Sequence, residues 1–272
     1  MSKVFVVDLA KCTGCYNCQL ACKDENCGND WTPYSKPQPM TGQFWAKVVE
    51  ETHGTKPKVK IFYTPTFCNH CKNAPCIEAG KDGAVYRRED GLVIIDPEKA
   101  AGQKQIAEAC PYGMIYWNEA LDLPQKCTGC AHLLDNGRTL PRCVEACPVD
   151  AIKFGEAEEL KDDMLGAEVL KPETGCHPQV FYRNRLGMFV GGLVYDPEEE
   201  EVIIGAKCRL TNGGKTWITY TDDFGDFWFK DLAKGIYKLA IEKEGYAVKT
   251  FDVIRVEDCV SLGDIPMEKA AD

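Results

Sequence analysis

Cysteine is the residue type whose spacing points most directly to chemistry in this chain of 272 residues, which contains sixteen cysteines. The first group stands in KCTGCYNCQLAC, where intervals of two, two and three residues separate Cys12, Cys15, Cys18 and Cys22. Three thiolates at this spacing converge on three irons of a cubane 4Fe-4S cluster, whereas the fourth ligates the other cluster of a pair. Zinc sites usually use two separated pairs of ligands, so the run favours a cubane over zinc.

A second complete run lies in CTGCAHLLDNGRTLPRCVEACP, with an interval stretched by a loop that contains Asn136-Gly137. Its ligands are Cys127, Cys130, Cys143 and Cys147. If each run gives its last cysteine to the other run, cluster one takes Cys12, Cys15, Cys18 and Cys147. Cluster two then takes Cys127, Cys130, Cys143 and Cys22.

The third group is incomplete. TFCNHCKNAPC supplies Cys68, Cys71 and Cys76, but Gly80 stands where a fourth cysteine would fall. The ligand from elsewhere is Cys110, which precedes a proline as Cys147 does and so matches the Cys-Pro ending of a ferredoxin run. The alternative is that Cys110 is a buried thiol packed as a small apolar residue. We expect cluster three to bind Cys68, Cys71, Cys76 and Cys110.

The vacant positions indicate how the runs are connected. The run that ends at Cys110 should have cysteines ten, seven and four residues earlier, so the four empty positions are Gly80, Ala100, Gln103 and Ile106. Under crossed ligation all four belong to one cluster, whereas uncrossed ligation would leave two incomplete sites. The pattern favours crossed ligation, with three 4Fe-4S clusters and one absent fourth site.

The remaining cysteines, Cys27, Cys176, Cys208 and Cys259, are isolated. Cys208 alternates with Ile204, Ala206 and Leu210, which predicts a core position on a strand, and we expect the others to be free thiols. The segment MSKVFVVDLAKC lacks the pattern of a signal peptide. This favours a reducing, cytoplasmic location over a disulfide framework.

Composition excludes several classes of partner and of site. A formal net charge of −10 disfavours nucleic acid, and no run approaches the roughly 18 apolar residues of a membrane span. No GxGxxG loop follows a predicted strand, and no Ser/His/Asp arrangement stands out. We therefore expect no catalytic residues, no flavin or nicotinamide site and no membrane contact on this chain.

The histidines and one proline-rich segment have different expected places. His70 lies between Cys68 and Cys71 and is predicted to donate a hydrogen bond beside a cluster rather than to ligate iron. The other histidines are predicted to be surface residues: His53, His132 and His177. Residues 31–42, WTPYSKPQPMTG, are predicted to form a surface excursion that could clasp a partner.

From about Gly187 the pattern changes to short apolar alternations with Gly and Asp turns. GAKCRLT and GIYKLAIEKEGY have the period of half-buried strands, and Asn212-Gly213-Gly214 is a turn signal. We expect about seven strands in a small β-sandwich. The chain is thus predicted as α+β: a polyferredoxin-like iron-sulfur domain over 1–180 and an all-β sandwich over 187–272.

These motifs resemble a known family. CTGCYNCQLACKDEN, CNHCKNAPC, REDGLVIID, EACPYGMI and KCTGCAHLLDNGRTLPRCVEACPVDAIKFG resemble the iron-sulfur subunit of molybdopterin oxidoreductases of the dimethyl sulfoxide reductase family. TDDFGDFWFKDLAKGIYKLAIEKEGY resembles carboxypeptidase regulatory-like or Cna-B-like sandwich modules. Family members usually carry four clusters, and this chain departs from them by the absent site and by the lack of a C-terminal membrane anchor.

The resemblance implies a non-catalytic electron-transfer subunit of a cytoplasmic enzyme. Molybdopterin and molybdenum would lie only on a large catalytic partner, in a heterodimer or a larger assembly. Within the family, three clusters with an appended β domain resemble the subunit of a molybdenum enzyme that moves a hydroxyl group between phenols. The alternatives are a subunit of another soluble molybdopterin reductase or hydrogenase-type complex, a stand-alone polyferredoxin, or a binding module whose clusters are structural.

Overall fold

A computed structural model describes residues 2–56, 58–185 and 187–270, and it divides the chain into two compact units. Unit one contains Met1–Glu50 and Tyr63–Arg185, and unit two contains Glu51–Phe62 and Leu186–Asp272. The tip of one hairpin, within residues 51–62, thus groups with the C-terminal part of the chain. The apolar residues of this segment follow the same pattern as those of the flanking residues. The grouping could therefore not be predicted from the sequence.

Unit one is centred on a three-stranded sheet of order β8-β1-β9. Its strands are β1 (Lys3–Asp8), β8 (Ile152–Glu156) and β9 (Val180–Arg183). Strand β1 pairs antiparallel with β8 and parallel with β9, so it is the central strand and Val4–Val7 are all buried. Phe5 packs against Phe67 and Phe154 with ring centroids 4.6 Å apart in each pair.

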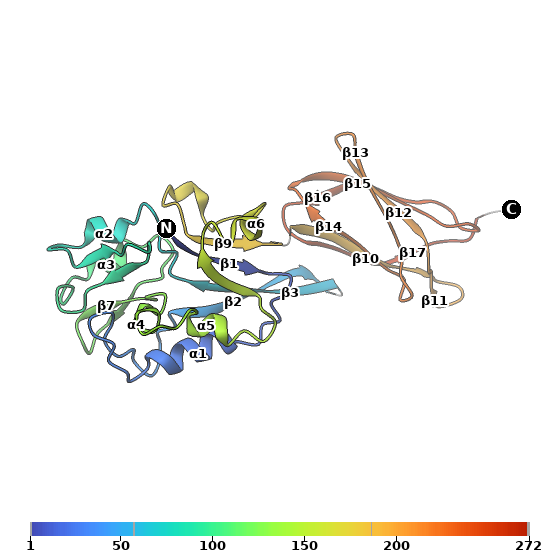
Figure 1. The fold of residues 1–272 in the computed structure, drawn as a ribbon. Helices are drawn as coiled ribbons and strands as arrows, with labels where there is room; N and C mark the ends of the chain where they lie inside the picture. Colours follow the sequence, from blue (N-terminus) through green and yellow to red (C-terminus); the bar gives the residue numbers. More distant parts are fainter. Residues whose placement is uncertain (1, 57, 186, 271–272) are drawn as a thin grey trace. The chain divides into compact units, whose positions relative to one another are not determined.

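Three two-stranded hairpins and short helices complete this part of the fold (Figure 1). The hairpins are β2 (Ala46–Thr55) with β3 (Lys58–Phe67), β4 (Val85–Arg87) with β5 (Val93–Ile95), and β6 (Tyr116–Asn118) with β7 (Leu123–Gln125). The helices are α1 (Asn17–Asn26), α2 (Pro75–Ala79), α3 (Gln105–Glu108), α4 (Ala131–Asp135), α5 (Arg142–Glu145), α6 (Lys161–Met164) and a 3-10 turn at Pro172–Thr174. Among the described residues, no helix has both the length and the apolar character needed to cross a bilayer.

The C-terminal strands of unit two form two four-stranded sheets. One sheet contains β10 (Met188–Asp196), β11 (Glu201–Val202), β14 (Asp226–Leu232) and β17 (Val260–Pro266). The other has the order β13-β12-β15-β16, with β12 (Lys207–Asn212), β13 (Lys215–Tyr220), β15 (Gly235–Glu242) and β16 (Lys249–Val256). These eight strands compare with the roughly seven expected from the turn signals.

The predicted period of two places the core of this all-β part correctly, with one exception. Ala206, Cys208 and Leu210 are fully buried, as expected for alternate residues of a strand. Ile204 was expected on the same face, but it precedes β12 and is 49% exposed. The Asn-Gly-Gly turn is confirmed: Gly213 and Gly214 have φ of 52° and 89°, the left-handed values that a tight β12–β13 hairpin requires.

We predict that Ile241→Ala, near the end of β15, costs about 2–5 kcal/mol of unfolding free energy because it leaves a cavity in this core. Ile241 is fully buried, whereas Ile218 on β13 is 54% exposed. The matched control Ile218→Ala should change stability by about 0.5 kcal/mol or less. Anaerobic guanidinium denaturation of the full chain measures both, and equal losses for the two variants would contradict the assigned core.

Candidate functional site

The cysteine loops curl because several of their residues adopt left-handed backbone conformations. Gly14 and Gly129 have φ of 69° and 65°, and Tyr16 and Cys130, which are not glycines, have φ of 61° and 54°. A Cβ added at Gly14 would lie 2.5 Å from the ring of Tyr63, so only glycine fits there. Left-handed non-glycine residues are uncommon and cluster at functional sites. Both complete runs therefore turn through left-handed residues, but the non-glycine one follows the second cysteine in the first run and is the second cysteine in the other.

The first predicted group comes together around one cavity. A space of about 310 Å³ is lined by Cys12, Cys15, Cys18 and Cys147, with walls that include Val48 and Ile152. Burial raises the pKa of Cys18 to about 11, and repulsion from Cys12 adds to this effect. Cys147 comes from the run that ends after α5, about 130 residues along the chain, so this convergence is the crossed arrangement.

The second group is the most enclosed. Cys22 on α1 and Cys143 on α5 are buried together with Cys127 and Cys130. Burial first, and then the charges of Cys127 and Cys130, raise the pKa of Cys22 well above its ordinary value. The pKa of Cys130 rises to about 12, because of burial and then because of Cys127. These four sulfurs therefore lie close to one another, as crossed ligation predicts.

The third group combines three cysteines of one run with the isolated fourth. A cavity is lined by Cys68, Cys71, Cys76 and Cys110, and also by His70 and Val93. Burial raises the pKa values of Cys76 and Cys110, and in Cys76 it brings the value to about 11. Cys110 is thus brought to the Cys68 loop rather than packed alone in an apolar core.

Backbone N–H groups surround the sulfurs. The N–H of Gly129 donates to Cys127 Sγ at 3.3 Å, that of Ala151 to Cys147 Sγ at 3.2 Å, and that of Met114 to Cys110 Sγ at 3.5 Å. Such donors stabilise a thiolate, whereas burial among other thiolates opposes it. Four converging sulfurs, each close to others of like charge, fit a group that binds thiolates through cationic iron. The residues present fit a 4Fe-4S cluster in each of the three groups.

The three groups follow one another in space in the order one, two, three. The charge of Cys18, in group one, raises the pKa of Cys143, in group two. On the other side, the charge of Cys68, in group three, adds to burial in raising the pKa of Cys127, in group two. Group two therefore lies between the other two groups.

The positions of the absent fourth site are filled by ordinary packing. Ala100 and Ile106 are fully buried in a core that contains Ala84 and Val85. A Cβ added at Gly80 would lie 3.0 Å from Val85 Cγ2, tighter than most packing contacts. An apolar core therefore occupies this part of the fold, beside Cys71 and Cys76 of group three.

Gln103, the fourth of these positions, makes polar contacts instead of apolar ones. Its Oε1 accepts a hydrogen bond from the N–H of Lys81 at 2.8 Å, and its Nε2 donates to the carbonyl of Lys99 at 2.8 Å. The side chain thus bridges the segment after α2 and the segment before α3. Hydrogen bonds and apolar contacts thus occupy the four positions at which an absent site was expected from the sequence.

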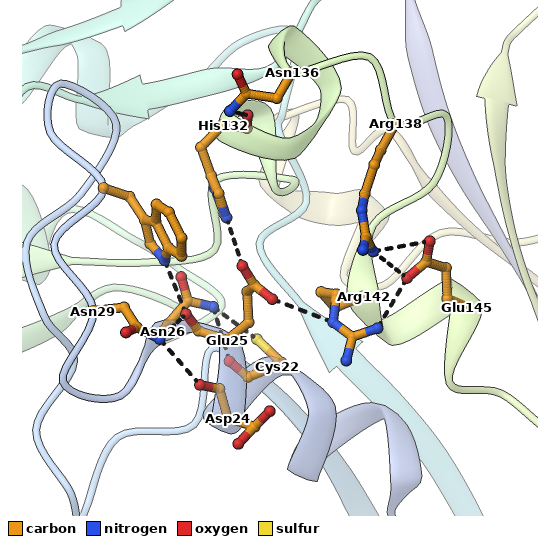
Figure 2. A network of polar contacts seen from close by, with 11 residues as sticks. Cys22, Asp24, Glu25, Asn26, Asn29, His132, Asn136, Arg138, Arg142 and Glu145 are labelled. Carbon is orange, nitrogen blue, oxygen red and sulfur yellow. Dashed lines mark hydrogen bonds and ion pairs between the residues drawn. The ribbon is translucent and has the colours of Figure 1, made fainter.

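A polar network joins the first and last cysteine runs (Figure 2). Glu25 at the end of α1 accepts a hydrogen bond from His132 Nε2 at 3.0 Å and an ion-pair contact from Arg142 Nε at 3.2 Å. His132 lies on α4 and Arg142 on α5, the helix that carries Cys143. The network holds α1, and therefore Cys22, against the run that supplies the other ligands of group two.

One prediction is wrong in this region. His132 was expected at the surface, but it is 2% exposed because it pairs with Glu25 and stacks on Trp31 with ring centroids 4.4 Å apart. Residues 31–42 were expected to form a surface excursion, and Thr32, Pro33 and residues 40–42 are exposed. Ser35 and Gln38 are buried, however, and Trp31 Nε1 donates to the carbonyl of Glu25 at 2.8 Å, so part of the segment packs on its own unit.

The isolated cysteines and the remaining histidines lie in different surroundings. None of the sixteen cysteines, all of which the structure describes, forms a disulfide, and Cys208 is a core residue as predicted. His177 is exposed as expected. His53 is half-buried, with Nδ1 3.1 Å from Asp258 Oδ1 and Cys259 beside them. The two partners are 205 residues apart in the chain, which is why sequence spacing could not identify this ion pair.

Comparison with known proteins agrees with this geometry. Residues 59–157 match the 4Fe-4S dicluster domain, and residues 190–262 match the carboxypeptidase regulatory-like domain. The predicted α+β fold, an iron-sulfur region followed by a β domain of this type, is confirmed.

Three relatives cover different shares of the chain. The pyrogallol hydroxytransferase small subunit of Pelobacter acidigallici is 40% identical over 96% of this chain and 98% of its own length. The arsenate respiratory reductase iron-sulfur subunit of Shewanella sp. (strain ANA-3) is 31% identical over 67% of this chain and 96% of its own. A subunit of the anaerobic dimethyl sulfoxide reductase of Escherichia coli (strain K12) is 36% identical over 64% of this chain and 82% of its own.

We predict that Glu25→Ala costs about 1.5–3 kcal/mol and lowers the iron bound by the Cys22 group, because it leaves His132 and Arg142 without their shared acceptor. The matched control is Glu158→Ala, since Glu158 pairs with Lys161 at 3.2 Å but is 81% exposed. This change should cost about 0.5 kcal/mol or less and leave iron content unaltered. Anaerobic denaturation and iron analysis compare the two, and full iron content in Glu25→Ala would contradict the role of the network.

Proposed function

This chain belongs to the iron-sulfur subunits of the dimethyl sulfoxide reductase family of molybdopterin enzymes, and we propose that it carries three 4Fe-4S clusters for a catalytic partner that transfers hydroxyl groups between phenols. Its general role is that of an electron-transfer subunit. The number of clusters, their ligands and the substrate of the partner are the proposed parts. The active site would lie on the partner chain, which also holds molybdopterin and molybdenum.

The observation that carries the cluster count is the convergence of twelve cysteines into three groups of four, with the fourth set of positions closed. We assign cluster one to Cys12, Cys15, Cys18 and Cys147, cluster two to Cys127, Cys130, Cys143 and Cys22, and cluster three to Cys68, Cys71, Cys76 and Cys110. Each assignment follows the crossed pattern. Apolar packing at Ala100 and Ile106 supports the absence of a fourth cluster.

A 4Fe-4S cluster supplies one-electron chemistry, whereas reactions at molybdenum use two-electron steps. The chain's own contribution is to hold the ligands, to exclude water and to donate N–H groups to sulfur. Cys15 is the one exposed residue among the twelve proposed ligands, whereas the four of group two are all buried. We therefore propose that electrons are exchanged with the partner at the Cys15 end.

Coverage of the relatives favours hydroxyl transfer over a respiratory reduction. The hydroxytransferase subunit aligns over 96% of this chain, which includes the β domain, whereas the two reductase subunits align over about two thirds. Hydroxyl transfer is redox-neutral overall, so electrons need only pass between the catalytic site and the clusters and back again. A series of clusters that ends at group three, next to the positions closed by packing, is sufficient for this exchange. The exchange also agrees with our proposal of a cytoplasmic heterodimer.

We predict about 12 iron atoms per chain after anaerobic purification, and about 8 in the Cys110→Ala variant, because the loss of one ligand removes one cubane. The control Cys27→Ala removes a half-buried cysteine outside the three groups and should keep about 12. Values near 16 or 8 in the unaltered chain would contradict the proposed count.

The partner is tested by affinity purification of the tagged chain from its native anaerobic host, with molybdenum and molybdopterin analysis. We expect a large molybdopterin chain in the purified complex and hydroxyl transfer from pyrogallol in the assay. A chain that purifies alone, without molybdenum, would favour the polyferredoxin alternative. A complex that reduces an acceptor without transferring hydroxyl groups would favour another reductase.

A further inference from the structure

Lys126 is a buried lysine that has no carboxylate partner. It is 2% exposed and follows β7, and its Nζ donates to the carbonyls of Val93 and Cys127, the latter at 3.0 Å. Among the ion pairs of the described residues, none includes Lys126. A buried ammonium group costs several kcal/mol unless other charges compensate it. The position therefore calls for a negative group that side-chain carboxylates do not provide.

The cysteine sulfurs of groups two and three are placed to provide that charge. Lys126 precedes Cys127 of group two in the chain. Its Nζ donates to the carbonyl of Cys127 itself and to that of Val93, which lines the cavity of group three with Cys76 and Cys110. Neither Lys126 nor Val93 is among the described residues that line the cavity of group one.

His70 places a second unusual group at the third cavity. It is 1% exposed, it has a left-handed φ of 42°, and it lines the cavity with Cys68, Cys71, Cys76 and Cys110. Its Nδ1 accepts a hydrogen bond from the N–H of Val93 at 3.0 Å, so in the neutral ring the proton is on Nε2. Nε2 has no hydrogen-bond partner among the residues that the structure describes, and an unsatisfied buried donor is costly.

One residue of β5, Val93, holds both side chains through its backbone. The N–H of Val93 donates to His70, and the carbonyl of the same residue accepts from Lys126. Val93 is buried and pairs with Arg87 of β4, so both groups are fixed by a hairpin rather than by a mobile loop.

We propose that Lys126 is a fixed positive charge that favours the reduced state of clusters two and three, and that His70 donates a hydrogen bond from Nε2 to cluster three alone. The inference rests on the proposed function, since it assumes the three assigned clusters. An added electron makes a cluster more negative, so a nearby cation and an N–H donor both raise its reduction potential. Electrons would then collect in groups two and three, at the end of the chain of sites that is farthest from Cys15.

The test is an anaerobic reductive titration of the purified complex, followed by electron paramagnetic resonance of each cluster. Lys126→Met and Lys126→Gln remove the charge, and Lys126→Arg keeps it. His70→Asn withdraws the donor and uses a residue that tolerates left-handed backbone. The controls are Lys99→Met, at a lysine 55% exposed, and His177→Leu, at an exposed histidine. Iron content is measured for every variant.

We expect removal of the Lys126 charge to lower the reduced-to-oxidised ratio of two clusters at least tenfold at fixed potential, about 59 mV for a one-electron couple. The third cluster, Lys126→Arg and the controls should keep their potentials. His70→Asn should lower the reduction potential of one cluster only. This should be one of the two clusters whose potentials fall when the Lys126 charge is removed. The proposal is overturned if variants with full iron content keep all three potentials, or if all three potentials shift equally. It is also overturned if the variants that remove the Lys126 charge or the His70 donor lose their iron. A different cluster count in the unaltered complex would instead overturn the proposed function.

Discussion

The constraint on which this structure depends is the convergence of like-charged sulfurs in a medium that disfavours charge. In groups two and three, burial and neighbouring sulfurs raise thiol pKa values, and in Cys130 the value reaches about 12. A fold that gathers four such groups without a bound cation would store repulsion at its centre. Iron removes that cost by binding the thiolates, and peptide N–H groups such as that of Gly129 reduce it further. The binding of iron and the folding of unit one are therefore coupled.

The crossed arrangement follows from helix geometry. Cys18 and Cys22 are four residues apart on α1, hence neighbours on one face, yet they serve adjacent groups. Helix α5 lies beside α1 and carries Cys143, with Cys147 just beyond its end (Figure 1). The contacts of Glu25 with His132 and Arg142 fix this pairing of elements. Near the four positions that are not cysteines, α3 is held by apolar packing through Ile106.

Much of this could be predicted from sequence because cysteine spacing encodes cluster geometry, and alternation encodes half-buried strands. The grouping of Cys110 with Cys68, Cys71 and Cys76 followed from counting vacant positions, and burial of Cys208 followed from a period of two. The burial of His132 could not be predicted, since its partner Glu25 is 107 residues away in the chain. The same holds for Lys126, whose carbonyl acceptor Val93 belongs to another hairpin. Long-range polar contacts carry no periodic signal, so sequence patterns miss them.

The most direct test of the central claim is an anomalous-diffraction map of the purified complex at the iron absorption edge. The account predicts three cubane-sized iron peaks in this chain, one of them bound by Cys68, Cys71, Cys76 and Cys110, and none near Ala100 and Ile106. A peak at the closed positions, or Cys110 Sγ remote from iron, would contradict the sharing of thiolates between distant runs.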